Sequence, residues 1–286
     1  MRKDENVLKM IEESGLDRIA GELKELTRLS NRIRTEAGDD DKPALGRSKI
    51  GGRPDLPGGT EWPLQGGRPL TFIAQIRLED VPWKTDLLPQ KGLLSFFYDA
   101  ADQPWGYDPQ HAGGWKVLYA ADADLLQRRS APEGTEHDGD FEPLNVEFSV
   151  QTTLPHWNTL AVRRMELTGD EIDLYIKLME QITDHNAPGF PIHRLMGWPD
   201  QVQGEMQLEC QLVTHGIYCG NPIGYRDPRR QELEPGAEGW KLLLQIDSED
   251  DIGMTWGDFG MIYFWIREDD LAKGDFDKVW VVLQCG

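Results

Sequence analysis

Apolar and polar residues alternate in several segments after residue 70, and this alternation predicts a strand-rich protein. In residues 71–78, Phe72, Ala74, Ile76 and Leu78 alternate with mostly polar neighbours, as expected for a strand with one buried face. Cys210 holds an apolar position in a similar alternation, so we expect it to point into the core. Strands are predicted at residues 71–78, 91–99, 114–120, 206–214, 241–246, 261–266 and 278–285.

Near the start of the chain the apolar spacing changes to a helical period. Leu16, Ile19, Leu23, Leu26 and Ile33 recur at intervals of three, four and seven residues. We therefore expect an amphipathic helix over residues 16–33 that covers a core, within an N-terminal helical segment of residues 1–42.

A second helix is predicted at about residues 169–186. Thr168 and Glu171 have the spacing of a capping box, which marks a helix start. The apolar face of this helix is expected to consist of Ile172, Tyr175, Ile176, Met179 and Ile182.

Three short motifs occur twice, in the same order. The sequence G-x-P-D stands at Gly52–Asp55 and at Gly197–Asp200; "FIAQI", with Gln75, corresponds to "LLLQI", with Gln245; and "GLLSFFYD" corresponds to "GMIYFWIRED". We interpret this order as an internal duplication. Chance similarity is the alternative, because Pro and Asp favour turns wherever they occur.

The predicted fold class is thus α+β and strand-rich, with two related, mostly antiparallel β halves, an N-terminal amphipathic helix and one helix between the halves. The halves would span about residues 45–165 and 190–286 of a domain that covers residues 43–286. A cleft between them is the expected place for any site.

Long stretches of the chain resemble one known family. They are "SKIGGRPDLPGGTEWP", "PLTFIAQIRLED", "LPQKGLLSFFYD", "HRLMGWPDQVQGEM", "LLLQIDSEDDIGMTWGDFGMIYFWI" and "DLAKGDFDKV". In this order, from about Arg47 to Gln284, they are similar to the YwqG-like family, a bacterial group of domains of unknown function. The resemblance implies a bacterial, cytosolic protein of mixed α and β structure. It implies no reaction, and the family's genomic association with polymorphic toxins suggests a toxin-neutralising (immunity-type) role for some members.

Composition restricts the classes of partner. The 286 residues carry a formal net charge of -20, which disfavours nucleic acid and anionic membranes and favours a basic protein partner. The start of the chain has no apolar run of signal-peptide length, so we expect a cytoplasmic location. The three cysteines show no disulfide spacing, which is typical of a reducing compartment.

The glycine-rich stretch "GGRPDLPGGTEWP", residues 51–63, invites comparison with phosphate-binding loops. It lacks the following Lys and hydroxyl of a phosphate loop, and Pro63 prevents an immediate helix interior. We interpret it as a rigid, packed turn.

The acidic stretch 247–258 is the candidate metal site, for calcium or another divalent cation. Asp247, Glu249, Asp251 and Asp258 fall at positions 1, 3, 5 and 12 of a calcium-loop numbering, where oxygen ligands are needed. Ile252 stands where such a loop requires Gly, so a solvated acidic loop without any cofactor is the alternative.

A zinc site is the second metal alternative. Cys210, His215 and Cys219, with His193 as a fourth ligand, have the right chemistry but lack close C-x2-C pairing. Ordinary buried thiols are the other interpretation. His193 and His156 are candidate general bases, because only His titrates near neutral pH. A structural, hydrogen-bonded role is the alternative.

Ten tryptophans raise the prospect of an aromatic binding cleft, because exposed indoles bind sugars and peptides. Six of them lie beside Gly or Pro or in short loops: Trp62, Trp105, Trp115, Trp157, Trp198 and Trp256. Caps on a β-rich core are the alternative role.

Two functions follow from these observations. The preferred one is a non-enzymatic protein that binds a macromolecular partner, steered by acidic loops such as Asp247 to Asp251. The alternative is a small-molecule or divalent-cation binding protein, or a hydrolase, with its site between the halves. The candidate site residues are Gln75, His193, Trp198, Gln245, Asp247, Trp256 and Asp258.

Overall fold

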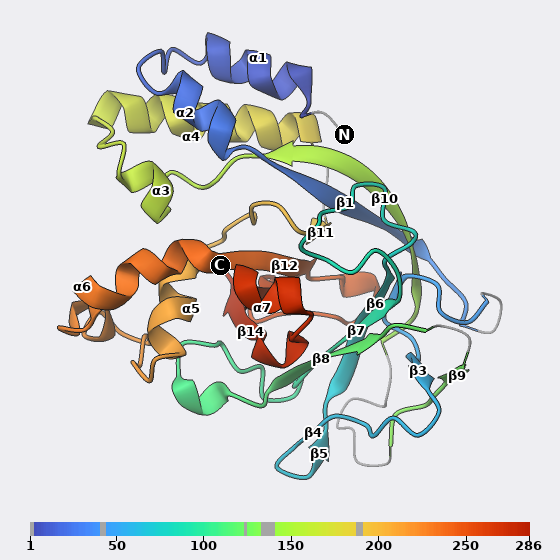
Figure 1. The fold of residues 1–286 in the computed structure, drawn as a ribbon. Helices are drawn as coiled ribbons and strands as arrows, with labels where there is room; N and C mark the ends of the chain where they lie inside the picture. Colours follow the sequence, from blue (N-terminus) through green and yellow to red (C-terminus); the bar gives the residue numbers. More distant parts are fainter. Residues whose placement is uncertain (1–2, 41–43, 123–124, 133–140, 187–190) are drawn as a thin grey trace.

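The computed structural model describes residues 3–40, 44–122, 125–132, 141–186 and 191–286, and most of its strands form a single antiparallel sheet (Figure 1). In order across the sheet, its ten strands are β14 (Trp280–Gln284), β13 (Met261–Arg267), β12 (Trp240–Asp247), β11 (His193–Leu195), β1 (Arg28–Ala37), β10 (Leu144–Thr153), β2 (Lys49–Ile50), β6 (Thr71–Arg77), β7 (Leu93–Tyr98) and β8 (Trp115–Ala120). Two small pairs lie outside it: β3 (Asp55–Pro57) with β9 (Leu126–Arg128), and β4 (Leu64–Gln65) with β5 (Arg68–Pro69).

Seven α-helices accompany the strands in the described part of the chain. They are α1 (Glu5–Glu13), α2 (Ala20–Leu26), α3 (Leu160–Arg163), α4 (Gly169–Asn186), α5 (Gln207–Val213), α6 (Arg230–Leu233) and α7 (Glu268–Lys273). Helices α1, α2 and α4 form a group at one end of β1 and β10, with its own apolar core around Val7, Ile11 and Tyr175 (Figure 1). None of the described helices has the length and apolar composition needed to cross a membrane.

Strands β1 and β10 form the middle of the sheet, and each connects two parts of the chain that are distant in sequence. They pair over ten residues, from Arg28 opposite Thr153 to Ala37 opposite Leu144. On its other side β1 pairs with β11, whereas β10 pairs with β2. One four-stranded arm, β2-β6-β7-β8, therefore lies beside β10, and the other, β11-β12-β13-β14, lies beside β1. The order of elements is compatible with the predicted duplication, which stays a prediction, as do the domain boundaries.

The sheet bends so that its two arms pack against each other through one apolar core. The rings of Phe96 on β7 and Phe264 on β13 meet edge to face, with centroids 5.2 Å apart, and both side chains are fully buried. The edge strands meet as well, because Trp115 on β8 contacts Trp280 on β14 at 4.8 Å between ring centroids. A single core thus joins the arms.

The N-terminal helix predicted for residues 16–33 is confirmed only over residues 20–26. Helix α2 ends at Leu26, and β1 begins at Arg28. Leu16, Ile19 and Leu23 pack against α4, as an amphipathic helix would, whereas Ile33 belongs to the core of the sheet. Ile33 follows Leu26 at a helical interval, so the spacing assigned it to the helix, but its segment is strand β1 in the centre of the sheet.

The strand predicted at residues 206–214 is also wrong, because most of this segment forms helix α5. Cys210 is fully buried, as expected. The alternation misled because Gln207 and Gln211 are buried too: Gln207 Nε2 donates to the carbonyl of Trp240, and Gln211 Oε1 accepts from the indole of Trp240. Polar residues with buried partners do not mark a solvent-facing side.

The other predicted strands are confirmed as β6, β7, β8, β12, β13 and β14. Strand β6 was expected to bury one face, but it buries both. Phe72 contributes to a second small core with Trp62 and Phe97, which covers the face opposite Ile76.

The helix predicted at about 169–186 is confirmed as α4. Its capping box is formed, with Thr168 N–H donating to Glu171 Oε2 at 2.9 Å and Glu171 N–H donating to Thr168 Oγ1 at 3.3 Å. Tyr175 and Ile182 are buried as predicted, whereas Ile176 is 38% exposed.

The contact between the two arms predicts a measurable coupling. We expect Phe264→Ala to lower the free energy of unfolding by about 3–5 kcal/mol, as for other buried aromatic residues. In a double-mutant cycle with Phe96→Ala, the coupling should be about 0.5–1.5 kcal/mol, because the two rings stabilise each other directly. Urea unfolding measures both quantities. Phe259→Ala, at a 66% exposed ring, is the control that should change little, and additive losses for Phe96 and Phe264 would contradict the contact.

Candidate functional site

The two G-x-P-D motifs are structural, and each is held by one of the two candidate glutamines. Gln75 Oε1 accepts from Asp55 N–H at 2.8 Å, and its Nε2 donates to Asp55 Oδ2 at 2.9 Å. Gln245 makes the same two bonds with Asp200, at 2.9 and 3.1 Å. Both glutamines are fully buried.

Each aspartate also binds an arginine. Arg128 Nε lies 2.8 Å from Asp55 Oδ1, and Arg194 Nη2 lies 2.6 Å from Asp200 Oδ2. Burial alone would raise the pKa of Asp55, but hydrogen bonds from Arg128, Gln75 and the backbone outweigh it and lower the pKa. The structure thus places Gln75 and Gln245 in two separate buried networks.

The glycine-rich stretch is a packed turn, as its sequence suggests. Gly51 and Gly52 have φ of 65° and 67°, which favours glycine. A Cβ on Gly52 would lie 2.6 Å from Asp40 Oδ2, and that carboxylate accepts from Arg53 N–H and Lys49 Nζ. The Asp40 carboxylate thus fills the space beside this turn.

His193, Asp247 and Glu249 do come together, in a closed network. Asp247 N–H donates to His193 Nδ1 at 3.1 Å, so His193 carries its proton on Nε2 and donates it to Glu249 Oε1 at 2.9 Å. Burial alone would raise the pKa of Glu249, but hydrogen bonds from His193 and Thr35 lower it. Burial raises the pKa of Asp247 against hydrogen bonds from Ile192 N–H and Ser248 N–H.

The residues of the predicted metal sites are dispersed. Asp251 and Asp258 are exposed, apart from the buried Asp247 and Glu249. Among the zinc candidates, Cys210 and Cys219 are buried free thiols, and His215 binds the carbonyl of Gln211. The described residues contain no group of three or more His, Cys, Asp or Glu side chains that could hold a metal ion.

Two tryptophans proposed for the site lie inside the protein. Trp256 is fully buried against Tyr98, with ring centroids 5.6 Å apart. Trp198 donates to the carbonyl of Leu26, and the Arg28 guanidinium lies 3.6 Å from its ring centroid. They cap the core, which was the alternative role for these residues.

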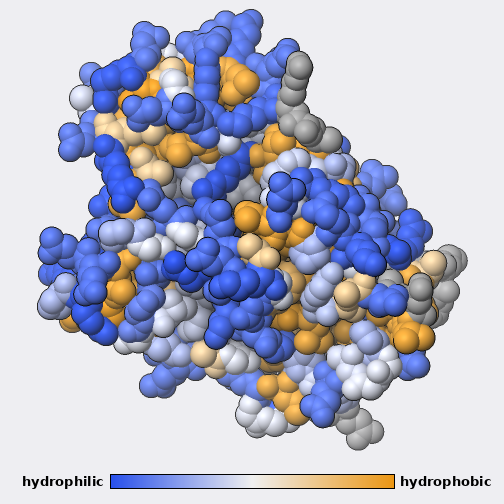
Figure 2. Space-filling view, in the orientation of Figure 1, coloured by the Kyte–Doolittle hydropathy of each residue, from blue (hydrophilic) through white to orange (hydrophobic). Residues whose placement is uncertain are grey.

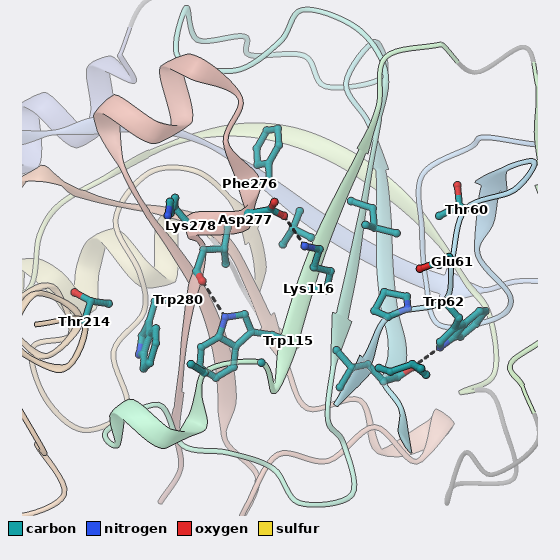
Figure 3. A pocket seen from close by; sticks show the side chains of 18 residues that line it. Thr60, Glu61, Trp62, Trp115, Lys116, Thr214, Phe276, Asp277, Lys278 and Trp280 are labelled. Carbon is teal, nitrogen blue, oxygen red and sulfur yellow. Dashed lines mark hydrogen bonds and ion pairs between the residues drawn. The ribbon is translucent and has the colours of Figure 1, made fainter. Parts of the chain in front are cut away.

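Two other tryptophans from the sequence, Trp62 and Trp115, line a cleft of about 950 Å³ between the two edges of the sheet (Figure 3). Its floor is strand β8, from Trp115 to Leu118. One wall runs from Phe276 in the short helical turn η5 (Phe276–Lys278) to Trp280, and the other is formed by residues 60–64 with Leu70. In Figure 2 most of the visible face is hydrophilic, and hydrophobic side chains gather over the region of β7, β8 and the β4–β5 pair.

The indoles of the cleft are fixed in place. Trp62, Trp115 and Trp280 each donate their Nε1–H to a backbone carbonyl, of Leu70, Val279 and Gly106, at 2.8 to 2.9 Å. Each is 7–8% exposed, so the rings present only their edges. A ligand would therefore meet a surface that is already ordered, which lowers the entropy cost of binding.

Strand β8 presents an unpaired backbone edge to this cleft. It is the last strand of the sheet, and in the described part of the chain only β7 pairs with it. Asp99 N–H donates to Gly114 O at 2.8 Å, next to the ladder. Because hydrogen-bonded pairs alternate in an antiparallel ladder, the N–H and C=O of Val117 point away from β7. These backbone groups are thus left unpaired by β7, although Val117 as a whole is only 2% exposed.

The charges of the cleft are close to balanced. Lys116 Nζ forms an ion pair with Asp277 at 2.5 Å, and it joins β8 to η5 (Figure 3). Glu61 and Lys278 also line the cleft. Sequence patterns did not indicate Trp280 or this ion pair as part of a site, because Trp280 and Lys278 stand in a segment with the pattern of a core strand.

Comparison with known families assigns residues 48–285 to a domain of unknown function, DUF1963. The chain belongs to this family. The match covers most of the chain, including the cleft-forming segments from Thr60 to Trp280. A comparison with curated proteins gave no match.

The His193 network predicts a pH-dependent contribution to stability. Glu249 accepts two buried hydrogen bonds, so Glu249→Gln should cost about 1–3 kcal/mol of the free energy of unfolding at pH 7. Because folding lowers the pKa of Glu249, this contribution exists above the ordinary glutamate pKa of about 4.3 and is lost as the pH falls through the folded value.

Urea unfolding of the wild type and the variant at pH 7 and at about pH 3.5 measures the effect. Asp251→Asn, at an exposed neighbour, is the control that should show no difference. A Glu249→Gln loss that is equally large at both pH values would contradict the role of the ionised carboxylate.

Proposed function

We propose that this DUF1963 domain is a non-enzymatic binding protein that takes an extended segment of a protein partner into the tryptophan-lined cleft. The observation that supports this most directly is the open edge of β8 on the floor of the cleft. An extended peptide can add to such an edge as a further strand, with backbone hydrogen bonds for affinity and side-chain contacts for specificity. The fixed indoles of Trp62, Trp115 and Trp280 are suited to contact its side chains.

The proposed partner is basic. The net charge of -20 attracts a basic protein over a distance and speeds encounter. Asp250 and Asp251, in the loop expected to steer a partner, are exposed. A toxin-neutralising (immunity-type) role in the bacterial cytoplasm, as suggested by the resemblance to the YwqG-like group, is the specific form of this proposal.

The alternative of a site between the halves at the seven candidate residues has less support. Gln75 and Gln245 lie in separate networks, Trp198 and Trp256 are core residues, and Asp258 is exposed. A small-molecule or divalent-cation binding protein, or a hydrolase, with its site at these residues stays a prediction.

Strand addition can be tested with two substitutions at one residue. A library of random dodecapeptides is displayed and selected on the full chain, and selected peptides are titrated by calorimetry. We expect Val117→Pro to weaken binding at least tenfold, because proline removes the N–H that faces the cleft and leaves the bonds to β7 intact. Val117→Ala keeps that N–H and is the matched control, which should bind within about threefold of the wild type.

Equal binding by the two Val117 variants would contradict strand addition, and so would a library that yields no binder. Circular dichroism shows whether each variant folds. If Val117→Pro does not fold, Lys116→Glu serves instead, and it should strengthen binding of basic peptides selectively, since Lys116 lies beside the proposed strand.

A further inference from the structure

A second cavity, of about 570 Å³, lies away from the cleft and combines opposite charges with aromatic walls. Its lining comes from the loop with Trp105 and Tyr107, from Glu209 on α5, from the turn η2 (Gly224–Arg226) and from the end of β14. The loop with Trp105 and Tyr107 belongs to the arm with β7 and β8, and the other parts belong to the arm with β12 to β14.

Glu209 provides a partly buried negative group on this lining. Its Oε2 accepts from the hydroxyl of Tyr225 at 2.8 Å, and it forms no ion pair with any residue that the structure describes. Burial raises the pKa of Glu209 to about 7, the Tyr225 hydrogen bond opposes this, and the charge of Glu205 adds to it. A cationic group placed beside Glu209 would stabilise its ionised form.

Two arginines line the same cavity, and they differ in whether their guanidinium group already has a partner. Arg230 is already engaged, because Nη2 lies 2.9 Å from Glu234 Oε1 and Nη1 donates to the carbonyl of Tyr225. The guanidinium of Arg226 makes no hydrogen bond or ion pair within the described ranges, and it is exposed. Arg226 is therefore available to a carboxylate, which guanidinium groups bind well.

The aromatic wall is rigid. The ring of Tyr107 packs against His111 and Tyr218, with centroids 5.0 and 5.6 Å apart, and Trp105 lies beside it at 6.4 Å. The backbone of Tyr107 is fixed by a hydrogen bond from Cys219 N–H at 2.8 Å. Burial raises the pKa of the Cys219 thiol to about 12, so this thiol stays protonated at neutral pH. The cavity is thus suited to non-covalent binding.

We propose that this cavity binds a small zwitterion of the α-amino acid type with an apolar or aromatic side chain. The ammonium group binds Glu209, the carboxylate binds Arg226, and the side chain packs against Trp105 and Tyr107. Aromatic rings next to a carboxylate favour a cationic nitrogen, and the cavity volume accommodates an amino acid with a large side chain. This site is distinct from the proposed peptide cleft, and neither depends on the other.

The proposal predicts how binding varies with pH. The ammonium group requires ionised Glu209, so affinity should increase as the pH rises through about 7 and then level off. If only the ionised form binds, the dissociation constant at pH 6 should be about tenfold higher than at pH 8. Of the titratable and charged groups nearby, Tyr225 and Glu205 act on the pKa of Glu209, and Cys219, Arg226 and Arg230 line the same cavity. Tyr225→Phe should shift the midpoint to higher pH, because it removes a hydrogen bond that lowers the pKa of Glu209.

Three probes separate the two charges in calorimetric titrations of the full chain. L-Phenylalanine carries both charges, phenethylamine carries only the amine, and 3-phenylpropanoate carries only the carboxylate. We expect L-phenylalanine to bind at least tenfold more tightly than either analogue, as the loss of one charge-assisted hydrogen bond implies. No detectable binding of L-phenylalanine at millimolar concentration, or equal binding of all three, would overturn the proposal.

Variants assign each charge to its residue. Glu209→Gln should weaken L-phenylalanine binding at least tenfold at pH 8 and abolish the pH dependence, and Arg226→Gln should remove the advantage of L-phenylalanine over phenethylamine. Glu232→Gln, the same change at an exposed position on α6, is the matched control and should leave binding unaltered. A pH profile that persists in Glu209→Gln would show that another group binds the amine.

Discussion

The ten-residue ladder between β1 and β10 is the contact on which both arms of the structure depend. By sequence, β1 precedes the first arm, yet it pairs with β11 of the second; β10 precedes the second arm, yet it pairs with β2 of the first. The first arm thus joins the sheet through β10, which precedes the second arm in the sequence. The second arm joins it through β1, which precedes the first. Loss of the ladder would divide the sheet between β1 and β10 and leave each arm with a central strand that belongs, by sequence, before the other arm. We therefore infer that the arms fold as one cooperative unit.

The cleft is a consequence of how this sheet bends. Because the arms pack face to face through Phe96 and Phe264, the edge strands β8 and β14 come close enough for Trp115 to contact Trp280. Among the described residues only β7 pairs with β8, so the other edge of β8 has no neighbouring strand beside Val117. Exposed edge strands invite uncontrolled association, and charged residues commonly limit it. The Lys116–Asp277 ion pair stands at this position and restricts which chains can approach the edge.

The sequence predicted the elements better than it predicted their partners. The strands at Gln75 and Gln245, the helix after Thr168 and the burial of Cys210 follow from local patterns, and the structure confirms them. Strand β1 and helix α5 were mistaken because buried polar residues such as Arg32 and Gln211 bind distant backbone or side-chain groups. The Trp115–Trp280 contact and the Glu209–Tyr225 bond depend on the bend of the sheet and on loop placement, and periodicity carries no information about either. The two glutamines make equivalent hydrogen bonds, each with the aspartate of a G-x-P-D turn, and their origin in a duplication stays a prediction.

The strong net charge of the chain and the balanced charge of its cleft act over different distances. Charges on the surface attract a basic partner over about 8–10 Å in physiological salt, and this attraction raises the rate of encounter. Inside the cleft, Lys116 is paired with Asp277, so the contact surface of β8 is nearly neutral, and backbone hydrogen bonds with indole contacts decide which segment stays bound. Salt should therefore act mainly on the association rate, whereas substitutions on the floor of the cleft act mainly on the dissociation rate. The net negative charge of the protein thus raises the rate at which a basic partner is met, and the ordered, nearly neutral cleft decides which segment of it stays bound. The proposed binding role requires both properties.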